Sequence, residues 1–332
     1  MKRALIVRTG AVGDVVLTLP VLAALKHHYP EIKIDVLGNK TNLSLLIEGG
    51  YAETALSIDR REMTSLFVKD GLPSSATRRI MQTYDLVVSY LPDPDGVFTS
   101  NIRQTSNGQV LTGSARPIPH LRTHMTQVLM AVLRPLNIHS MDLPPTLRVP
   151  LSSVPDCYST REQVIAIHPG SGGKYKCWPP DRYAALIHRI YALGFRPFIT
   201  TGPADDDTLS ELLSLVDKDS LFLFKNRSLT EIAGMLSQCR AMIGNDTGIT
   251  HLAAAVGTPV IALFGPTDPA VWGPRGQNVH ILWGNENIEE DAGIRSWGEP
   301  FAERALTEIE VDHVMEVLVG LEGVGKTSKQ IY

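Results

Sequence analysis

The feature that most constrains the fold is an alternation of short, continuous apolar runs with longer segments of helical periodicity, in two successive blocks. Such runs are typical of parallel strands that are covered on both faces. They lie at 4–8, 32–37, 86–89, 164–168, 197–201, 241–243 and 260–263. Helices are predicted at 15–28, 123–136, 183–193, 206–216 and 309–318. The pattern predicts an α/β protein with two doubly wound, Rossmann-like domains that face each other across a cleft.

The boundary between the two domains is predicted in a proline-rich stretch. Between Met141 and Gln163 the chain carries several prolines and serines, a composition typical of linkers. The predicted domains are residues 1–150 and 151–308, followed by a C-terminal helix and a loosely ordered tail at 309–332. With 332 residues the chain is long enough for two domains that each bury a core of their own.

Composition and charge exclude several classes of protein. The formal net charge of −4 provides no general basic field for nucleic acid. The cysteines, Cys157, Cys177 and Cys239, lack metal-ligand spacing and are too few for a disulfide framework, which indicates a reducing cytoplasm. No apolar run approaches the length of a membrane span, and the run after Met1 is too short for a signal peptide. Any membrane contact is therefore expected to be peripheral.

The segment 241–269 carries the strongest functional signal, because it reads as strand, polar turn, short helix, strand and second polar turn. The helix begins at a turn that contains Asp246, Thr247 and Gly248. Backbone N–H groups there lack partners and the helix dipole is positive, which suits a phosphate. Thr247 and His251 are four residues apart and can share one helix face. The alternative is a plain helix cap with a buried histidine, but the combination of features favours a ligand site.

A second loop of small and basic residues follows the apolar run at 164–168. The residues predicted to line it are Gly170, Ser171, Gly172, Lys174 and Lys176. Small residues expose backbone N–H groups, and either lysine can place its ammonium against a phosphate. The loop is not a Walker A sequence, so triphosphate hydrolysis is not expected. The alternative is a solvated flexible loop, against which the rigid Trp178-Pro179-Pro180 anchor argues. Two such loops in one domain suit a diphosphate better than a lone phosphate.

A third loop joins the first predicted strand to the first predicted helix. Gly10 and Gly13 allow a tight turn and close approach to the backbone, but the spacing lacks a full dinucleotide fingerprint. Asp14 stands at the helix start, where the dipole stabilises a carboxylate by about 0.3–1 kcal/mol. The alternative is a simple N-cap. At the carboxyl end of the strand the carboxylate also faces the predicted crevice, which is the position that a general base needs.

These residues together resemble the ADP-heptose:lipopolysaccharide heptosyltransferase family, glycosyltransferase family 9, over nearly the whole chain. The matching motifs are Gly13-Asp14 with Leu19-Pro20, His168-Pro169-Gly170 with Lys176 and Trp178-Pro179, and Asn245-Asp246-Thr247-Gly248 with His251 and Phe264-Gly265-Pro266-Thr267. The last of these motifs is the most specific one.

The resemblance implies a GT-B fold, with the acceptor on the N-terminal domain and the nucleotide sugar on the C-terminal domain. It implies transfer of a heptose from ADP-heptose to a hydroxyl of a lipopolysaccharide inner-core or related glycan acceptor, with inversion at the anomeric carbon. The ADP-sugar is a co-substrate, and neither a cofactor nor a metal is expected. The implied partners are the nucleotide-sugar donor and a glycolipid or oligosaccharide acceptor, without nucleic acid. The implied location is cytoplasmic, with peripheral contact at the inner face of the membrane.

The resemblance also implies roles for individual residues. Asp14 matches the general base, and Lys176 matches the lysine that contacts the donor phosphate. The residues that match the segment around the diphosphate and sugar are Asp246, Thr247, Gly248 and His251. The second loop is similar to the donor loop of the family, although Ser171 and Gly172 stand where some members carry paired threonines.

Two further assignments from the resemblance carry alternatives. Asp205 matches an acidic residue for the nucleoside ribose, and the alternative is a surface carboxylate. The residues expected on the acceptor side are Gly13, Arg60 and Arg61. The two arginines match basic side chains that meet an acidic sugar, and the alternative is a solvated basic pair.

Several other functions share parts of this pattern. A transferase of the same fold could use another nucleotide-sugar donor, and a sugar-nucleotide epimerase also uses two such domains. An inactive glycan-binding homologue is disfavoured because Asp14, Lys176 and His251 are all present. A nicotinamide dehydrogenase is favoured less than any of these, because the sequence lacks the dinucleotide fingerprint.

Overall fold

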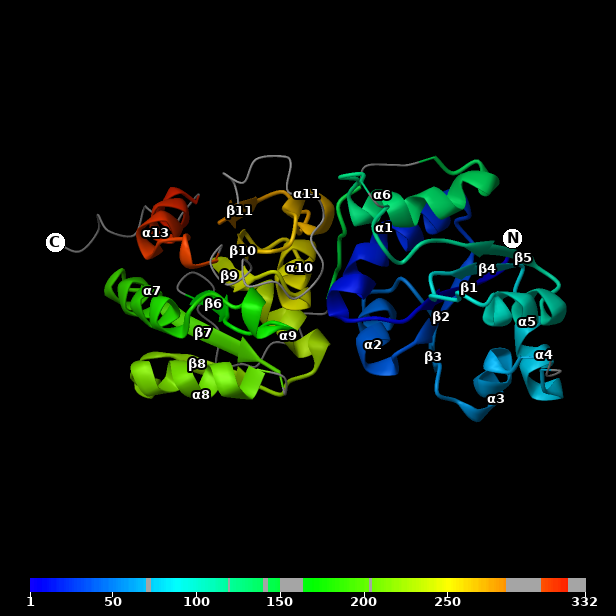
Figure 1. Ribbon diagram of the computed structural model, residues 1–332, viewed down its shortest axis with the longest axis horizontal. Helices are drawn as coiled ribbons and strands as arrows, with labels where there is room; N and C mark the ends of the chain where they lie inside the picture. The colour runs from blue at the N-terminus through cyan, green and yellow to red at the C-terminus, as the bar shows by residue number, and fades with distance from the viewer. Residues whose placement is uncertain are drawn as a thin grey trace. The chain divides into compact units, whose positions relative to one another are not determined.

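The computed structural model describes residues 1–69, 73–118, 120–139, 143–149, 164–202, 205–284 and 306–321. Contacts divide the chain into two compact units, Met1–Arg148 (unit 1) and Val149–Tyr332 (unit 2). Each unit is built on one parallel sheet with helices around it (Figure 1), which confirms the predicted α/β class with two Rossmann-like domains. Most of the predicted linker and the predicted C-terminal tail lie outside the described residues.

Unit 1 contains a five-stranded parallel sheet in the order β3-β2-β1-β4-β5. Its strands are β1 (Arg3–Arg8), β2 (Lys33–Gly38), β3 (Thr54–Ser57), β4 (Leu86–Ser89) and β5 (Gln109–Thr112). Its helices are α1 (Val12–His28), α2 (Lys40–Glu48), α3 (Arg61–Thr64), α4 (Ser75–Met81), α5 (Val97–Thr105) and α6 (Met125–Met130), with 3-10 turns at Ser65–Phe67 and Ala131–Leu136.

The central strand and the first helix of unit 1 are apolar because both are covered. β1 is buried from Ala4 to Arg8. α1 is buried without interruption from Val15 to Leu22, because it packs against α6 and α2. Basic residues occupy the last turn of α1, where the helix dipole is negative. This packing holds the first turn of α1 directly after the carboxyl end of β1.

Unit 2 contains a six-stranded parallel sheet in the order β11-β10-β9-β6-β7-β8. Its strands are β6 (Val164–His168), β7 (Arg196–Thr201), β8 (Phe222–Lys225), β9 (Ala241–Asn245), β10 (Val260–Phe264) and β11 (Val279–Trp283). Its helices are α7 (Pro180–Ala192), α8 (Asp206–Leu215), α9 (Leu229–Leu236), α10 (Gly248–Ala255), α11 (Pro269–Trp272) and α13 (Val311–Gly320), with 3-10 turns at Lys174–Lys176 and Lys218–Ser220.

The order of the strands creates a topological switch point in each sheet. In unit 1 the chain runs outward from β1 to β3 and then returns to the other side of β1, where β4 pairs with it. In unit 2 it runs outward from β6 to β8 and returns with β9 on the other side of β6. Ligands of open α/β sheets bind at such points, outside the carboxyl ends of the strands. The two candidate sites are therefore the segments after β1 and β4 and those after β6 and β9.

The strands without a sequence prediction are the four edge strands, β3, β5, β8 and β11. Each contains exposed or half-exposed residues, so it lacks the continuous apolar run of a strand covered on both faces. The predicted helix at 123–136 is α6 followed by the 3-10 segment Ala131–Leu136, which contains Pro135. Proline lacks an N–H group and interrupts regular α-helical bonding.

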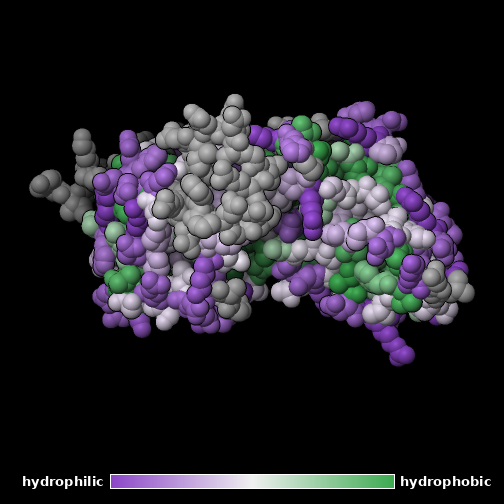
Figure 2. Space-filling model, in the orientation of Figure 1, coloured by the Kyte–Doolittle hydropathy of each residue, from purple (hydrophilic) through white to green (hydrophobic). Residues whose placement is uncertain are grey.

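Within the described ranges, no helix combines the length and the apolar character needed to cross a membrane. On the face in Figure 2, hydrophilic residues predominate on each unit and apolar residues form smaller patches. The exposed large apolar side chains are spread along the chain and include Phe67, Ile118, Tyr191 and Val319.

Candidate functional site

The switch point of unit 1 contains an ion pair between the last residue of β1 and the first turn of α1. The Arg8 side chain is 1% exposed, and its Nη2 donates to Asp14 Oδ1 over 2.7 Å. Arg8 Nε also donates to the Asp14 carbonyl oxygen over 3.2 Å. The guanidinium lies over the ring of Tyr90, the residue after β4, with 5.8 Å to the ring centroid. The pair therefore occupies the position between β1 and β4 where this sheet can bind a ligand.

The second oxygen of the Asp14 carboxylate faces the turn before α1. Oδ2 accepts a hydrogen bond from the Ala11 N–H over 3.0 Å, and the side chain is 29% exposed. Gly10 leaves room for it, because a Cβ there would lie 2.5 Å from Asp14 Oδ2 and the backbone φ of 154° is one that L side chains rarely adopt. Asp14 is therefore not the N-cap of α1, which is Ala11, but the third helical residue, whose accessible carboxylate caps the Ala11 N–H.

The switch point of unit 2 is organised by Asn245, the last residue of β9. Its side chain is fully buried. Oδ1 accepts from the Trp178 N–H and from the Tyr183 hydroxyl, each over 3.0 Å. Nδ2 donates to the carbonyl oxygens of Pro169 at 2.8 Å and Gly170 at 3.2 Å. One side chain therefore joins the loop after β6 to the turn after β9, the two phosphate-type loops of the sequence.

Lys176 and Asp246 form the ion pair of this second switch point. Lys176 Nζ lies 2.7 Å from Asp246 Oδ2, with exposures of 16% and 12%. Ser171 Oγ donates to the Asp246 carbonyl oxygen over 3.4 Å. Lys174 points elsewhere, since it pairs with Asp207 and both of these side chains are more than four-fifths exposed. Of the two predicted lysines, Lys176 is the one at the switch point.

The turn after β9 leads into α10, whose first residue is Gly248. Thr247 is the N-cap, and its hydroxyl accepts from the Thr250 N–H at 3.4 Å. The Thr250 hydroxyl donates to the Asn245 carbonyl oxygen over 2.6 Å and ties the turn to the strand. His251 is buried in the first turns of the helix. The N–H groups at the start of α10 thus follow directly after Asp246, the partner of Lys176, and can hold an anion there.

Asp205 lies inside unit 2, and the alternative of a surface carboxylate is wrong. The residue is 7% exposed, and its Oδ2 accepts from the Gly202 N–H over 2.8 Å. Its neighbour is His168 at the end of β6, with 4.0 Å between His168 Nε2 and Asp205 Oδ2. Gly170 is needed beside them, because a Cβ there would lie 1.9 Å from Asp205 Oδ1. Contact of Asp205 with a ribose stays a prediction.

The buried His168 predicts a pH dependence of stability. Burial lowers the pKa of its imidazole from the ordinary value near 6.5, although Asp205 opposes this shift. The unfolded chain therefore binds a proton more readily, so the stability from neutral His168 is present above pH 6.5 and is lost below it. The expected slope is up to about 1.4 kcal/mol per pH unit. Urea unfolding from pH 7 to pH 5 measures it. His168→Gln should flatten the curve, whereas replacement of the exposed His188 by Gln should leave it unchanged.

The residues predicted on the acceptor side lie in unit 1. Gly13 is in the first turn of α1, next to Asp14. Arg60 immediately precedes α3, is 49% exposed and lies 3.7 Å from Glu62. Arg61 begins α3 and is also exposed. Both arginines follow the carboxyl end of β3, the edge of the sheet that also carries Asp14, and their contact with an acceptor stays a prediction.

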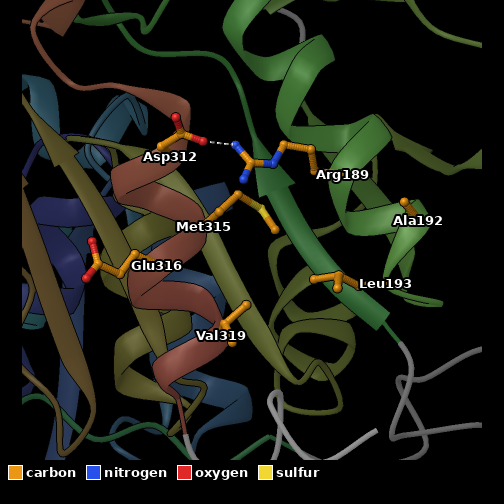
Figure 3. A pocket seen from close by; sticks show the side chains of 7 residues that line it. All are labelled: Arg189, Ala192, Leu193, Asp312, Met315, Glu316 and Val319. Atoms are coloured by element: carbon orange, nitrogen blue, oxygen red, sulfur yellow. Dashed lines mark hydrogen bonds and ion pairs between the residues drawn. The ribbon is translucent and has the colours of Figure 1, made fainter. Parts of the chain in front are cut away.

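A surface hollow of about 560 Å³ lies between α7 and α13 (Figure 3). Its lining residues are Arg189, Ala192, Leu193, Asp312, Met315, Glu316 and Val319. Arg189 and Asp312 are paired across it. α7 lines the hollow with its last turns, after which the chain continues to the amino end of β7. The hollow is therefore separate from the switch point, which lies at the carboxyl ends of the strands.

Sequence reasoning assigned no role to Arg8 or Asn245. The signal for both was a polar residue at the end of an otherwise apolar strand. Each terminates the strand next to its switch point. Because the strand order is not visible in the sequence, neither residue could be matched to its partners in advance.

Comparisons with known proteins agree on one family. The sequence profile of glycosyltransferase family 9 (heptosyltransferase) matches residues 119–297, just over half of the chain. Lipopolysaccharide heptosyltransferase 3 of Escherichia coli K12 is 27% identical over 301 residues, 82% of this chain and 85% of that protein. The structure of the E. coli ADP-heptose lipopolysaccharide heptosyltransferase II has a TM-score of 0.72 at 20% identity and covers 97% of this chain and 98% of that one. E. coli heptosyltransferase WaaC with ADP has a TM-score of 0.72 at 19% identity, covering 96% and 99%.

Proposed function

Because the chain belongs to glycosyltransferase family 9, the heptosyltransferase family, we propose that it transfers a heptosyl group from ADP-heptose to a hydroxyl of a lipopolysaccharide inner-core or related glycan acceptor. The observation that carries the donor half of the proposal is the switch point of unit 2. There the Lys176 ammonium is paired with Asp246, which stands in the turn that leads into α10, and this combination of a lysine with a helix start suits a diphosphate. The similarity to lipopolysaccharide heptosyltransferase 3 supports the choice of acceptor, and the similarity to heptosyltransferase WaaC with ADP supports the choice of donor.

The donor diphosphate is proposed to bind at the N–H groups of Thr247 and Gly248 and at the Lys176 ammonium. Asp246 holds Lys176 in place before the donor arrives, so little reorganisation is needed when charge develops on the leaving group. These groups supply the positive charge that a divalent cation provides in other transferases, so the proposed reaction needs no metal.

The chemical step is a displacement at the anomeric carbon. The acceptor oxygen forms a bond to that carbon while the bond to the diphosphate oxygen breaks, which inverts the configuration. The acceptor hydroxyl proton passes to Asp14, and the electron pair leaves with ADP. Asp14 is proposed as the base because its carboxylate is accessible at the switch point of unit 1 and because it matches the general base of the family. Arg60 and Arg61 are proposed to meet acidic groups of the acceptor.

The proposed location follows from the proposed acceptor. A glycolipid core is amphiphilic and has its head group at the membrane surface. We therefore place the enzyme in the cytoplasm, with peripheral contact at the inner face of the cytoplasmic membrane.

Calorimetric titration tests the donor assignment. We expect ADP to bind more tightly than UDP or GDP, with the same affinity in EDTA as in magnesium. Lys176→Ala should weaken ADP binding by about 10–100-fold, because a charge-assisted contact to the phosphate is lost. Lys218→Ala removes an exposed lysine of the same unit and should change nothing. A preference for UDP or GDP, or a requirement for magnesium, would contradict the donor assignment. Epimerisation of the nucleotide sugar without an acceptor would contradict the transferase assignment.

A further inference from the structure

Arg8 is an unusual arginine in this protein. Among the residues that the structure describes, it is the one arginine that is buried, at 1% exposure. Burial lowers the pKa of its guanidinium from the ordinary value, but arginine stays charged in proteins. A buried charge is tolerated when it is paired and hydrogen-bonded. Its environment must therefore contain a partner that compensates the charge.

The compensation comes from two sides. Asp14 accepts through both its carboxylate oxygen Oδ1 and its carbonyl oxygen. The Tyr90 ring lies under the guanidinium and is itself held by its hydroxyl, which donates to the Leu129 carbonyl oxygen over 2.7 Å. Asp14 and Tyr90 are the ionisable groups that act on Arg8 from the elements around it. The guanidinium is thus fixed on one face by an aromatic ring and at its edge by α1.

The same contacts restrict the Asp14 carboxylate. Oδ1 is bound by Arg8, and Oδ2 is bound by the Ala11 N–H. Rotation of the carboxylate would break both bonds, and it would leave the buried Arg8 Nη2 without its acceptor. One carboxylate orientation is therefore strongly preferred, with the side chain still 29% exposed to an incoming molecule.

We propose that Arg8 is a positioning residue for sugar transfer, which fixes the orientation of the Asp14 carboxylate. The proposal rests on the role of Asp14 as the general base under Proposed function. Arg8 does not touch the substrate in this scheme. It acts through Asp14, and a fixed orientation matters because misplacing a reacting group by about 1 Å can cost about 10²-fold in rate.

Two variants at position 8 test the proposal by steady-state kinetics with a saturating acceptor. Arg8→Met keeps the length and loses the charge, so kcat should fall by about 10²-fold. The KM for the acceptor should stay within about a factor of two, because Arg8 acts through Asp14 and does not touch the acceptor. The calorimetric affinity for ADP should not change. Arg8→Lys restores the charge without the two-pronged contact, so it should restore only part of kcat.

The matched control is Arg3→Met. Arg3 begins the same strand and is paired with Asp35 over 2.7 Å, but at the amino end of the sheet. Its replacement should leave kcat and the KM for the acceptor unchanged. If Arg8→Met unfolds the protein, as its thermal transition would show, Arg8→Lys carries the test with the same readouts.

A double variant separates this proposal from the assignment of the base. In an Asp14→Asn background, Arg8→Met should lower kcat no further, since Arg8 acts through the carboxylate. A further fall of equal size would show an independent structural role and overturn the proposal. An unchanged kcat in folded Arg8→Met would overturn it as well. If Asp14→Asn alone kept full activity, the base assignment itself would be wrong, which is a different result.

Discussion

Replacing Asp14 with alanine is expected to lower kcat by about 10²–10⁴-fold, the usual contribution of a general base. Without the carboxylate, the acceptor hydroxyl must lose its proton to water as the new bond forms. The affinity for ADP should stay within roughly a factor of two, because an interaction made only in the transition state does not contribute to ground-state binding. Single-turnover transfer and calorimetry with ADP, made on the same preparation, measure the two effects separately.

Two further variants make this result specific. Asp14→Asn keeps an oxygen for the Ala11 N–H but cannot accept the proton, so it should be about as slow as Asp14→Ala. Asp85→Asn makes the same change of charge at the amino end of the sheet, where Asp85 accepts from the Lys2 and Arg3 N–H groups, and should keep full activity. Near-normal turnover of Asp14→Ala would contradict the assignment of the base.

Replacing Asn245 with alanine is expected to lower the free energy of unfolding by about 2–5 kcal/mol. Four hydrogen bonds are lost, and each buried group left without a partner costs about 1–3 kcal/mol. The Trp178 N–H loses its acceptor inside a packed core, while the Tyr183 hydroxyl retains the His168 carbonyl oxygen at 3.4 Å. Urea unfolding measures the loss. ADP binding should weaken as well, because the loop after β6 is no longer joined to the turn after β9.

Asn101 provides the matched control for Asn245. It is a buried asparagine of unit 1, whose Nδ2 donates to the Leu66 and Val68 carbonyl oxygens over 3.0 and 3.1 Å. Asn101→Ala should also destabilise the protein but should leave the affinity for ADP unchanged. If Asn245→Ala bound ADP as tightly as the native protein, the proposed link between this side chain and the donor loops would be wrong.

The core of each sheet could be predicted from the sequence, whereas its edges could not. β1, β6 and β9 are covered on both faces, so their residues are apolar without interruption. The edge strand β3 consists of exposed and half-exposed residues, and its pattern does not differ from that of a loop. The strands predicted along the chain therefore include the central strands of both sheets but lack the edge strands.

The candidate site was predictable to a similar degree. Asp14, Lys176 and Asp246 stand at loops after apolar runs, where small residues and helix starts indicate ligand binding. The composition of the loop left either lysine open, and only the family resemblance selected Lys176. The structure places Lys176 in an ion pair at the switch point and Lys174 on the surface. The sequence also left Asp205 open between a ligand role and the surface, and the structure buries it beside His168.

The sequence by itself determined the local elements of this protein: which runs form covered strands, where most helices lie to within a few residues, and which loops combine the small and basic residues that we propose to bind phosphate. These properties depend on periodicity and on neighbouring residues. Only the tertiary structure decided that β1 pairs with β4 and β6 with β9. That pairing brings together Lys176 and Asp246, which are 70 residues apart. The physical reason is that strand order is set by long-range packing of whole elements, which no local pattern encodes.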